Sequence, residues 1–189
     1  RWSPTRVRPL AGRTMLVLGF GRTGVEVAKR ARAMGMGVLG VSRSGVAREG
    51  ADEMHGPEAL HELLPRADVL SIHVPLTPET RGRIGVEELA LLPEGALVLN
   101  AARGAVLSEG GLLGALEQNV AGAWLDVFEQ EPPEDRELVE LDQVITTPHL
   151  GASTKEAQKA AAMVIADHAF VVHPLSSLVL ILGVVMTAS

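Results

Sequence analysis

Short runs of apolar residues alternate along the chain with longer segments whose apolar residues recur at the spacing of a helix. Residues 15–19 form the first run, and residues 22–34 follow with a helical period that stops at Gly35. The same reasoning predicts further strands at 37–42, 69–74, 96–100, 121–127 and 143–147, and further helices at 57–64, 86–92, 108–118 and 153–170. Such alternation is typical of a parallel sheet with crossover helices. We therefore predict an α/β fold, a Rossmann-type doubly wound parallel sheet with helices on both faces.

Composition limits the classes of protein to which the chain can belong. It has 189 residues, of which 47% are hydrophobic, enough for one well-packed domain and too few for two full-size domains. A net charge of −6 argues against nucleic acid as a partner. Cysteine and tyrosine are absent, so disulfides, thiolate metal sites, a cysteine nucleophile and a tyrosine acid are excluded. No histidine cluster has metal-ligand spacing, and no metal site is predicted.

The two ends of the chain bear on its location. The first ten residues carry no targeting signal, so the cytoplasm is the expected compartment, and the lack of an initiator Met indicates a fragment or a processed piece. Residues 170–189 contain no Asp, Glu, Lys or Arg, but Pro174 and two serines divide them, which disfavours a membrane-spanning helix. A buried strand or a tail for a partner surface fits this segment better.

A glycine-rich turn joins the first predicted strand to the first predicted helix. Gly19-Phe20-Gly21-Arg22-Thr23-Gly24 has the G-x-G-x-x-G spacing of a dinucleotide-binding turn. The first glycine permits the bend, the second lets the backbone approach a pyrophosphate, and the third allows close helix packing. The amides of Arg22 and Thr23 then face the phosphates. A structural turn and the related turn of methyltransferases are the alternatives. We expect a dinucleotide-binding domain at 1–170 and an apolar tail of unknown role at 171–189.

The residues after the second predicted strand bear on the choice of cofactor. NAD-binding sites usually place an acidic residue there to bond the ribose 2′-hydroxyl, whereas this chain has Ser42-Arg43-Ser44. Arg43 is suited to pair with a 2′-phosphate, and the two serines can donate further hydrogen bonds. The segment predicts NADP as the preferred cofactor and NAD as the second choice. The alternative is a solvated loop arginine.

Four polar residues stand at or after later predicted strand ends, where ligands bind in open α/β sheets. They are Arg103, Asp126, Glu131 and His149. A histidine with a nearby carboxylate can act as a general acid/base, and an arginine can hold a carboxylate substrate. Each residue taken singly is more often structural. Their joint position beside a nucleotide-binding turn favours a catalytic site.

Five sequence blocks in order resemble the NAD(P)-binding domain of the D-isomer-specific 2-hydroxyacid dehydrogenases, from Trp2 to about Ala169. They are the glycine turn, preceded by residues 10–14, and then residues 73–80, 100–104, 125–132 and 147–154. The Ser42-Arg43-Ser44 segment resembles the glyoxylate and hydroxypyruvate reductase branch of that family. The resemblance implies hydride transfer between NAD(P)H and a small 2-oxo or 2-hydroxy acid such as glyoxylate or hydroxypyruvate.

The resemblance also implies a role for each residue that matches a family motif. Arg103 corresponds to the arginine that orients the substrate, His149 to the acid/base, and Glu131 to the carboxylate that tunes the histidine. The residues implied in cofactor binding are Gly19, Gly21, Arg22, Thr23, Gly24, Ser42, Arg43, Ser44, Val74, Pro75, Ala101, Ala102, Arg103, Asp126, His149 and Gly151. Of these, Val74 and Pro75 line the adenosine side, and Ala101, Ala102 and Asp126 the nicotinamide end.

Family resemblance also sets the expected partners. Members begin with a separate substrate domain, which we expect to be absent here, so this chain alone should turn over its substrate slowly or not at all. The family dimerises through the cofactor-binding domain, which implies a homodimer. Two alternatives stay open: a non-catalytic NAD(P)-sensing module like the C-terminal binding protein corepressors, and a fragment without independent function.

Overall fold

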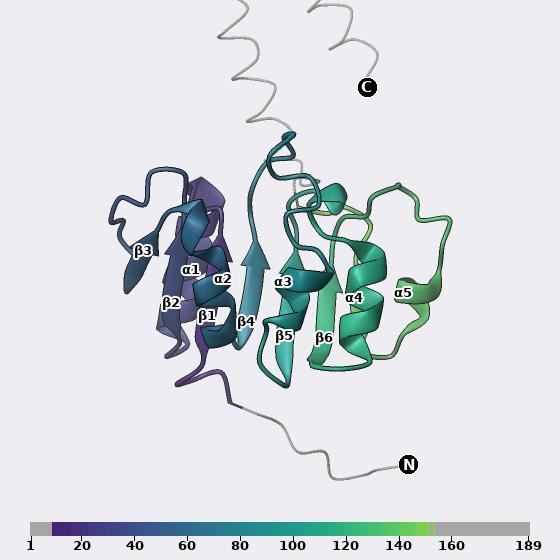
Figure 1. Ribbon diagram of the computed structural model, residues 1–189, viewed down its shortest axis with the longest axis horizontal. Helices are drawn as coiled ribbons and strands as arrows, with labels where there is room; N and C mark the ends of the chain where they lie inside the picture. The colour runs from purple at the N-terminus through teal and green to yellow at the C-terminus, as the bar shows by residue number, and fades with distance from the viewer. Residues whose placement is uncertain (1–8, 152, 154–189) are drawn as a thin grey trace, which may run out of the picture. The chain divides into compact units, whose positions relative to one another are not determined.

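Seven parallel β-strands form one sheet in the computed structural model, which describes residues 9–151 and 153. They are β1 (Thr14–Leu18), β2 (Gly37–Val41), β3 (Glu53–His55), β4 (Val69–Ile72), β5 (Ala96–Asn100), β6 (Val120–Leu125) and β7 (Val144–Thr146). Their order across the sheet is β3-β2-β1-β4-β5-β6-β7, and every neighbouring pair is parallel (Figure 1). The chain moves outward in one direction from β1 to β3 and in the other from β4 to β7, which is the doubly wound topology. The predicted fold class is confirmed.

Helices cover both faces of this sheet. Helix α1 (Arg22–Ala33) buries Ala28 and Ala31 against one face, beside Val17 and Val38. The helices α2 (Leu60–Leu63), α3 (Val86–Ala90), α4 (Glu109–Leu116) and α5 (Glu137–Glu140) bury their leucines in a second cluster, on the other face. In Figure 1, α3 and α4 lie on the viewer's side of the strands.

The central strand β1 shows why the apolar runs are continuous. Leu16 and Val17 are neighbours in sequence and are both fully buried. Successive side chains of a strand point to opposite faces, so Leu16 belongs to the core cluster under α2 to α5 and Val17 to the cluster under α1. Burying one such side chain stabilises a fold by about 1.5–3 kcal/mol. A strand covered on both sides therefore requires apolar residues at successive positions.

Helix α4 begins at a serine cap. Ser108 Oγ accepts a hydrogen bond from the Gly111 amide at 3.1 Å, which satisfies one of the amides that have no partner inside the helix. Glu109 follows in the first turn, where the helix dipole favours a carboxylate. The cap thus fixes the first turn of α4.

The sequence pattern missed one strand and one α-helix. Strand β3 has three residues and both its ends are polar, so it lacks the apolar run by which a strand is recognised. Helix α5 is a single turn with glutamates at both ends. The helix predicted at 57–64 is shorter than expected, because α2 is flanked by 3₁₀ turns at Pro57–Ala59 and Leu64–Arg66.

The chain divides into two compact units, residues 1–148 and residues 149–189. The sheet and the five labelled helices belong to the first unit. In the second unit the structure describes residues 149–151 and 153. The helix predicted at 153–170, apart from its first residue, and the apolar tail predicted at 171–189 lie outside the described residues.

Candidate cofactor-binding and active site

The parallel direction of the strands brings most of the predicted site residues to one edge of the sheet. The segments 19–24, 42–44, 73–75, 101–103 and 126–131 follow β1, β2, β4, β5 and β6 in turn. The carboxyl ends of parallel strands share an edge, so these segments line that edge in the order of the strands (Figure 1). The glycine turn stands where the winding reverses, between the 42–44 and 73–75 segments. This switch point is where open α/β sheets bind their ligands.

The glycine turn needs glycine at two positions for steric reasons and leaves a third position open. Gly19 has a φ of 100°, and a Cβ there would lie 2.7 Å from the backbone nitrogen of Val74. A Cβ on Gly24 would collide with the carbonyl oxygen of Gly19. A Cβ on Gly21, by contrast, would meet no atom of the described residues within 4 Å. The space beside Gly21 fits a backbone that a phosphate approaches.

The first turn of α1 presents its amides at the same place. Gly21 precedes the helix and provides no side-chain cap. Arg22 and Thr23 at the helix start are exposed. Their amides are among the first four of the helix, which have no partner inside it and favour an anion through the helix dipole. The residues present therefore fit the pyrophosphate of a dinucleotide.

Ser42 follows directly after β2. Its hydroxyl oxygen, Oγ, is buried and has no hydrogen bond within the described residues. The Ser42 amide donates to the His55 carbonyl at 3.0 Å, which joins this segment to β3. Arg43 is exposed, and its guanidinium makes no hydrogen bond or ion pair in the described part of the chain. Ser44 Oγ accepts a long hydrogen bond of 3.5 Å from the Val46 amide. Buried hydroxyls normally have a partner, so Ser42 fits a site completed by a ligand.

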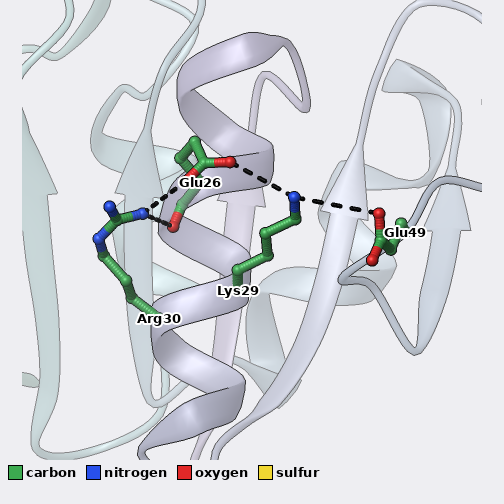
Figure 2. A network of polar contacts seen from close by, with 4 residues as sticks. All are labelled: Glu26, Lys29, Arg30 and Glu49. Atoms are coloured by element: carbon green, nitrogen blue, oxygen red, sulfur yellow. Dashed lines mark hydrogen bonds and ion pairs between the residues drawn. The ribbon is translucent and has the colours of Figure 1, made fainter.

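Charged residues tie the loop that carries Arg43 to helix α1. Figure 2 shows Lys29 between two carboxylates, 3.4 Å from Glu26 on the same helix and 3.9 Å from Glu49 on the loop. Arg30 lies 2.8 Å from Glu26, and its hydrogen bond, together with that of Lys29, lowers the pKa of Glu26. These side chains are exposed, so each pair contributes little to stability. The Lys29–Glu49 distance shows that the loop lies beside the helix whose start forms the glycine turn.

A half-buried histidine ends the next segment of the edge. A hydrogen bond of 2.8 Å joins His73 Nε2 to Ser71 Oγ, and burial lowers the pKa of His73. The imidazole is therefore neutral at pH 7. The His73 amide donates to the Leu18 carbonyl at 2.7 Å, which ties β4 to β1 beside the glycine turn. Val74 packs against the core, and Pro75 is exposed.

The turn that carries Arg103 is shaped by a buried asparagine. Asn100 is 1% exposed; its Nδ2 donates to the Arg103 carbonyl at 3.1 Å, and its Oδ1 accepts from the Ala102 amide at 3.1 Å. Arg103 itself is exposed, and its Nη1 donates to the Ala102 carbonyl at 2.6 Å. Because Asn100 binds the backbone of both Ala102 and Arg103, the backbone that carries the Arg103 guanidinium has a defined position at the sheet edge.

The neighbouring segment holds two carboxyl groups in different surroundings. Asp126 is buried, and its Oδ1 accepts a hydrogen bond of 2.6 Å from Thr147 Oγ1. Glu131 is exposed, and its Oε1 accepts from the Phe128 amide at 3.1 Å. The structure thus places Asp126 and Glu131 on the loop next to the Arg103 turn, as predicted from their positions after a strand.

His149 and Gly151 belong to the second unit and are described on their own. His149 is exposed and has a φ of 52°, a left-handed conformation that non-glycine residues adopt uncommonly. Its carbonyl oxygen accepts a hydrogen bond from Ser153 Oγ at 3.2 Å, and the Ser153 amide donates to the Leu150 carbonyl at 3.0 Å. These bonds close a tight local turn at His149.

Within residues 9–151 and 153, no group of three or more His, Asp or Glu side chains is placed to hold a metal ion. In that part of the chain, no helix has both the length and the apolar character that a membrane crossing requires.

The family follows from the sequence as a whole. Residues 1–151 match the family model described as D-isomer specific 2-hydroxyacid dehydrogenase, NAD binding domain. The chain belongs to this family. The resemblance predicted from its five blocks is confirmed, and the fold described above is the NAD-binding domain of a D-2-hydroxyacid dehydrogenase.

Similar proteins include more than one activity within the D-2-hydroxyacid dehydrogenases. The chain is 48% identical over 162 residues to a D-3-phosphoglycerate dehydrogenase from Methanocaldococcus jannaschii, covering 84% of this chain and 30% of the relative. It is 42% identical over 162 residues to a glyoxylate reductase from Thermococcus litoralis, covering 84% of this chain and 48% of the relative. The chain thus spans less than half the length of these curated relatives.

Solved structures of D-2-hydroxyacid dehydrogenases share the fold. A D-isomer specific 2-hydroxyacid dehydrogenase from Xanthobacter autotrophicus Py2, solved in complex with NADPH and MES, matches with a TM-score of 0.79 and 39% identity. The match covers 90% of this chain and 71% of that one.

Several residues at the carboxyl edge of the sheet were given no role in the predictions from sequence. Asn100 lies inside a family block, yet nothing in its position shows that it holds both sides of the Arg103 turn. Thr147 likewise gives no local sign that it donates to Asp126. Gly104 and Glu109 contact the 126–131 loop only because β5, β6 and the start of α4 meet at one edge.

Proposed function

We propose that this chain is the cofactor-binding part of an oxidoreductase that interconverts small 2-oxo and 2-hydroxy acids, such as glyoxylate or hydroxypyruvate and their reduced forms. The proposal depends on one observation, the set of residues at the carboxyl edge of the sheet. A dinucleotide turn after β1, an exposed arginine after β5 and a loop with two carboxyl groups after β6 share one sheet edge within a domain of the D-2-hydroxyacid dehydrogenase family.

The cofactor, when bound, supplies or accepts the hydride. The chain's own residues hold it: the 19–24 turn and the amides of Arg22 and Thr23 bind the pyrophosphate. The 42–44 segment holds the adenosine ribose, with Val74 and Pro75 beside the adenosine. Ala101, Ala102 and Asp126 hold the nicotinamide end, where the buried Asp126 orients the carboxamide. Within the described residues, the open space at Gly21 and the Ser42 hydroxyl without a partner support this placement.

The remaining chemistry is assigned to three side chains. Arg103 holds the substrate carboxylate and carbonyl through paired hydrogen bonds, so that charge developing on the carbonyl oxygen meets a fixed cation. His149 gives a proton to that oxygen during reduction and takes it back during oxidation. Glu131 stabilises the protonated imidazole, because a carboxylate favours the charged form of a histidine.

NADP is the preferred cofactor in this proposal. Ser42 stands where NAD-specific sites carry an acid, so nothing in the segment repels a 2′-phosphate. Arg43 is exposed and unpaired within the described residues, and Ser42 Oγ lacks a partner there. A charge-assisted contact to the phosphate is worth about ten- to a hundredfold in affinity.

Calorimetry with NADPH and NADH tests both binding and preference on this chain. We expect both cofactors to bind and NADPH to bind more tightly. The double variant Ser42→Asp with Arg43→Ala should reverse the order, because it adds an acid and removes the cation. Arg48→Ala, which removes another exposed arginine of the same loop, is the control. Equal affinity for the two cofactors in the parent chain would contradict the assignment of Arg43.

Substrate choice is tested by comparing acids in this chain joined to the substrate domain of the glyoxylate reductase relative and, separately, to that of the D-3-phosphoglycerate dehydrogenase relative, so that the preference of a borrowed domain is recognised. Oxidation of 3-phosphoglycerate is the second candidate activity, because a D-3-phosphoglycerate dehydrogenase is 48% identical to this chain. Reduction of glyoxylate and hydroxypyruvate favours the first assignment, and turnover of 3-phosphoglycerate alone favours the second.

The assigned catalytic roles are tested by His149→Ala and Arg103→Lys in that joined protein. His149→Ala should abolish nearly all turnover, a loss far larger than any change in cofactor affinity. Arg103→Lys should raise KM for the oxo acid, because a lysine cannot form paired bonds. Near-normal turnover in His149→Ala would refute the acid/base role. Cofactor binding with no turnover of any acid would favour the NAD(P)-sensing module.

We further propose a homodimer in the cytoplasm. Both rest on the family to which the chain belongs. Sedimentation equilibrium of the chain at micromolar concentration tests the homodimer. A monomer mass would contradict it. Fractionation of the source cells tests the cytoplasmic location.

A further inference from the structure

The loop of Glu131 is packed against the turn of Arg103 through backbone atoms. A Cβ on Gly104 would collide with the Phe128 carbonyl group and with the Glu129 nitrogen, so the two backbones touch at Gly104. Gly104 is buried and directly follows Arg103. Any shift of residues 128–131 therefore changes the distance between the two loops that carry the proposed catalytic side chains.

A carboxylate from a third element holds the same loop. Glu109 is the first residue of α4, and its Oε1 accepts a hydrogen bond of 2.6 Å from the Glu129 amide. The first turn of α4 is itself fixed, because Ser108 Oγ accepts from the Gly111 amide. Glu109 thus connects the loop to a rigid helix start.

The preceding amide, that of Phe128, completes the connection to Glu131. The Phe128 amide donates to Glu131 Oε1 at 3.1 Å, so the side chain folds back over its own turn. The amides of two consecutive residues, Phe128 and Glu129, are bound to two different glutamates. The first bond orients Glu131 within the loop, and the second orients the loop relative to α4.

We propose that Glu109 is a positioning residue for Glu131. It acts through the Glu129 amide and holds the 128–131 turn against Gly104, so that the Glu131 carboxylate keeps its place beside the Arg103 turn. The importance of Glu131 rests on the proposed function, whereas the anchoring by Glu109 does not.

Amide exchange measured by NMR on this chain tests the anchoring. In Glu109→Ala the Glu129 amide should exchange about ten- to a hundredfold faster, because it loses a hydrogen bond to a charged group. Glu109→Gln should restore the parent rate, since its amide oxygen accepts the same bond. Glu117→Ala, which removes an exposed glutamate at the other end of α4, should leave the rate unchanged.

A pH titration in the same samples tests the link to Glu131. The Phe128 amide shift reports the ionisation of Glu131, because the two groups share a hydrogen bond. Glu109→Ala should weaken that titration and Glu109→Gln should keep it. Equal Glu129 exchange, or an unchanged Phe128 titration, in Glu109→Ala and parent would overturn the inference. Neither readout uses turnover, so failure of the proposed activity is seen separately, as the absence of acid turnover in the joined protein.

Discussion

Thr147, directly after β7, donates its hydroxyl proton to Oδ1 of Asp126, directly after β6, over 2.6 Å. Asp126 is 2% exposed, and its backbone amide donates to the Asn100 carbonyl at 2.9 Å. The carboxyl group assigned to the nicotinamide end is therefore oriented from two neighbouring strands. A rigid position of this kind is what a specific contact to a cofactor needs.

Replacing Thr147 with Val should weaken both the fold and the binding of NADPH. The substitution keeps the shape of the side chain but removes the donor to a buried carboxyl group, which costs about 1–3 kcal/mol of unfolding free energy. Urea denaturation and calorimetry measure the two effects. Thr147→Ser keeps the hydroxyl and should stay close to the parent chain. Parent-like stability and affinity in Thr147→Val would show that this bond does not orient Asp126.

Two glycines near α4 should respond to alanine in opposite directions. Gly104→Ala forces a Cβ into the Phe128 backbone, so we expect a loss of about 1–3 kcal/mol in unfolding free energy. Gly110→Ala places its Cβ where no described atom lies within 4 Å, inside a helix, and should stabilise by up to about 1 kcal/mol. The melting temperatures of both variants, measured by thermal unfolding, test these two expectations. Equal melting temperatures would contradict the close approach at Gly104.

Alanine in the glycine turn should separate folding from cofactor binding. Gly21 has a φ of −86°, which alanine adopts, and open space for a Cβ, so Gly21→Ala should fold with nearly the parent stability. Its methyl group would occupy the space assigned to the phosphates, and affinity for NADPH should fall at least about tenfold. Gly19→Ala should destabilise the chain itself, because of its φ of 100° and the contact with Val74. Unchanged affinity in Gly21→Ala would place the pyrophosphate elsewhere.

His73 should make the fold less stable in mild acid. Burial lowers its pKa from the ordinary value of 6.5, so below that pH the unfolded chain binds a proton that the folded chain does not. The unfolding free energy therefore falls as the pH drops below 6.5, until the lowered pKa has been passed. Urea denaturation of the parent chain and of His73→Gln, at several pH values between about 7 and 5, measures this contribution. The parent should lose more unfolding free energy than His73→Gln as the pH falls; parallel curves would show that His73 does not contribute this loss.

Local chemistry explains how much of the fold was readable from the sequence. Continuous apolar runs such as 15–18 arise because a strand covered on both faces buries successive residues, and this requirement leaves a mark in the sequence itself. The spacing of Gly19, Gly21 and Gly24 marks a turn for the same reason, since a bend, an open approach and a close packing each need a missing side chain. Strand β3 left no such mark, because it is short and polar at both ends.

The sequence by itself therefore determined the fold class, the family and the position of each predicted site residue after a strand. Only the tertiary structure decided which of the first unit's residues support them: that Asn100 shapes the Arg103 turn, that Gly104 touches Phe128, and that Ser42 Oγ is buried without a partner in the described residues. These relationships depend on which strands become neighbours. Residues 20 or more positions apart, such as Glu109 and Glu129, meet only after β5, β6 and α4 have packed at one edge, and no local pattern records that contact.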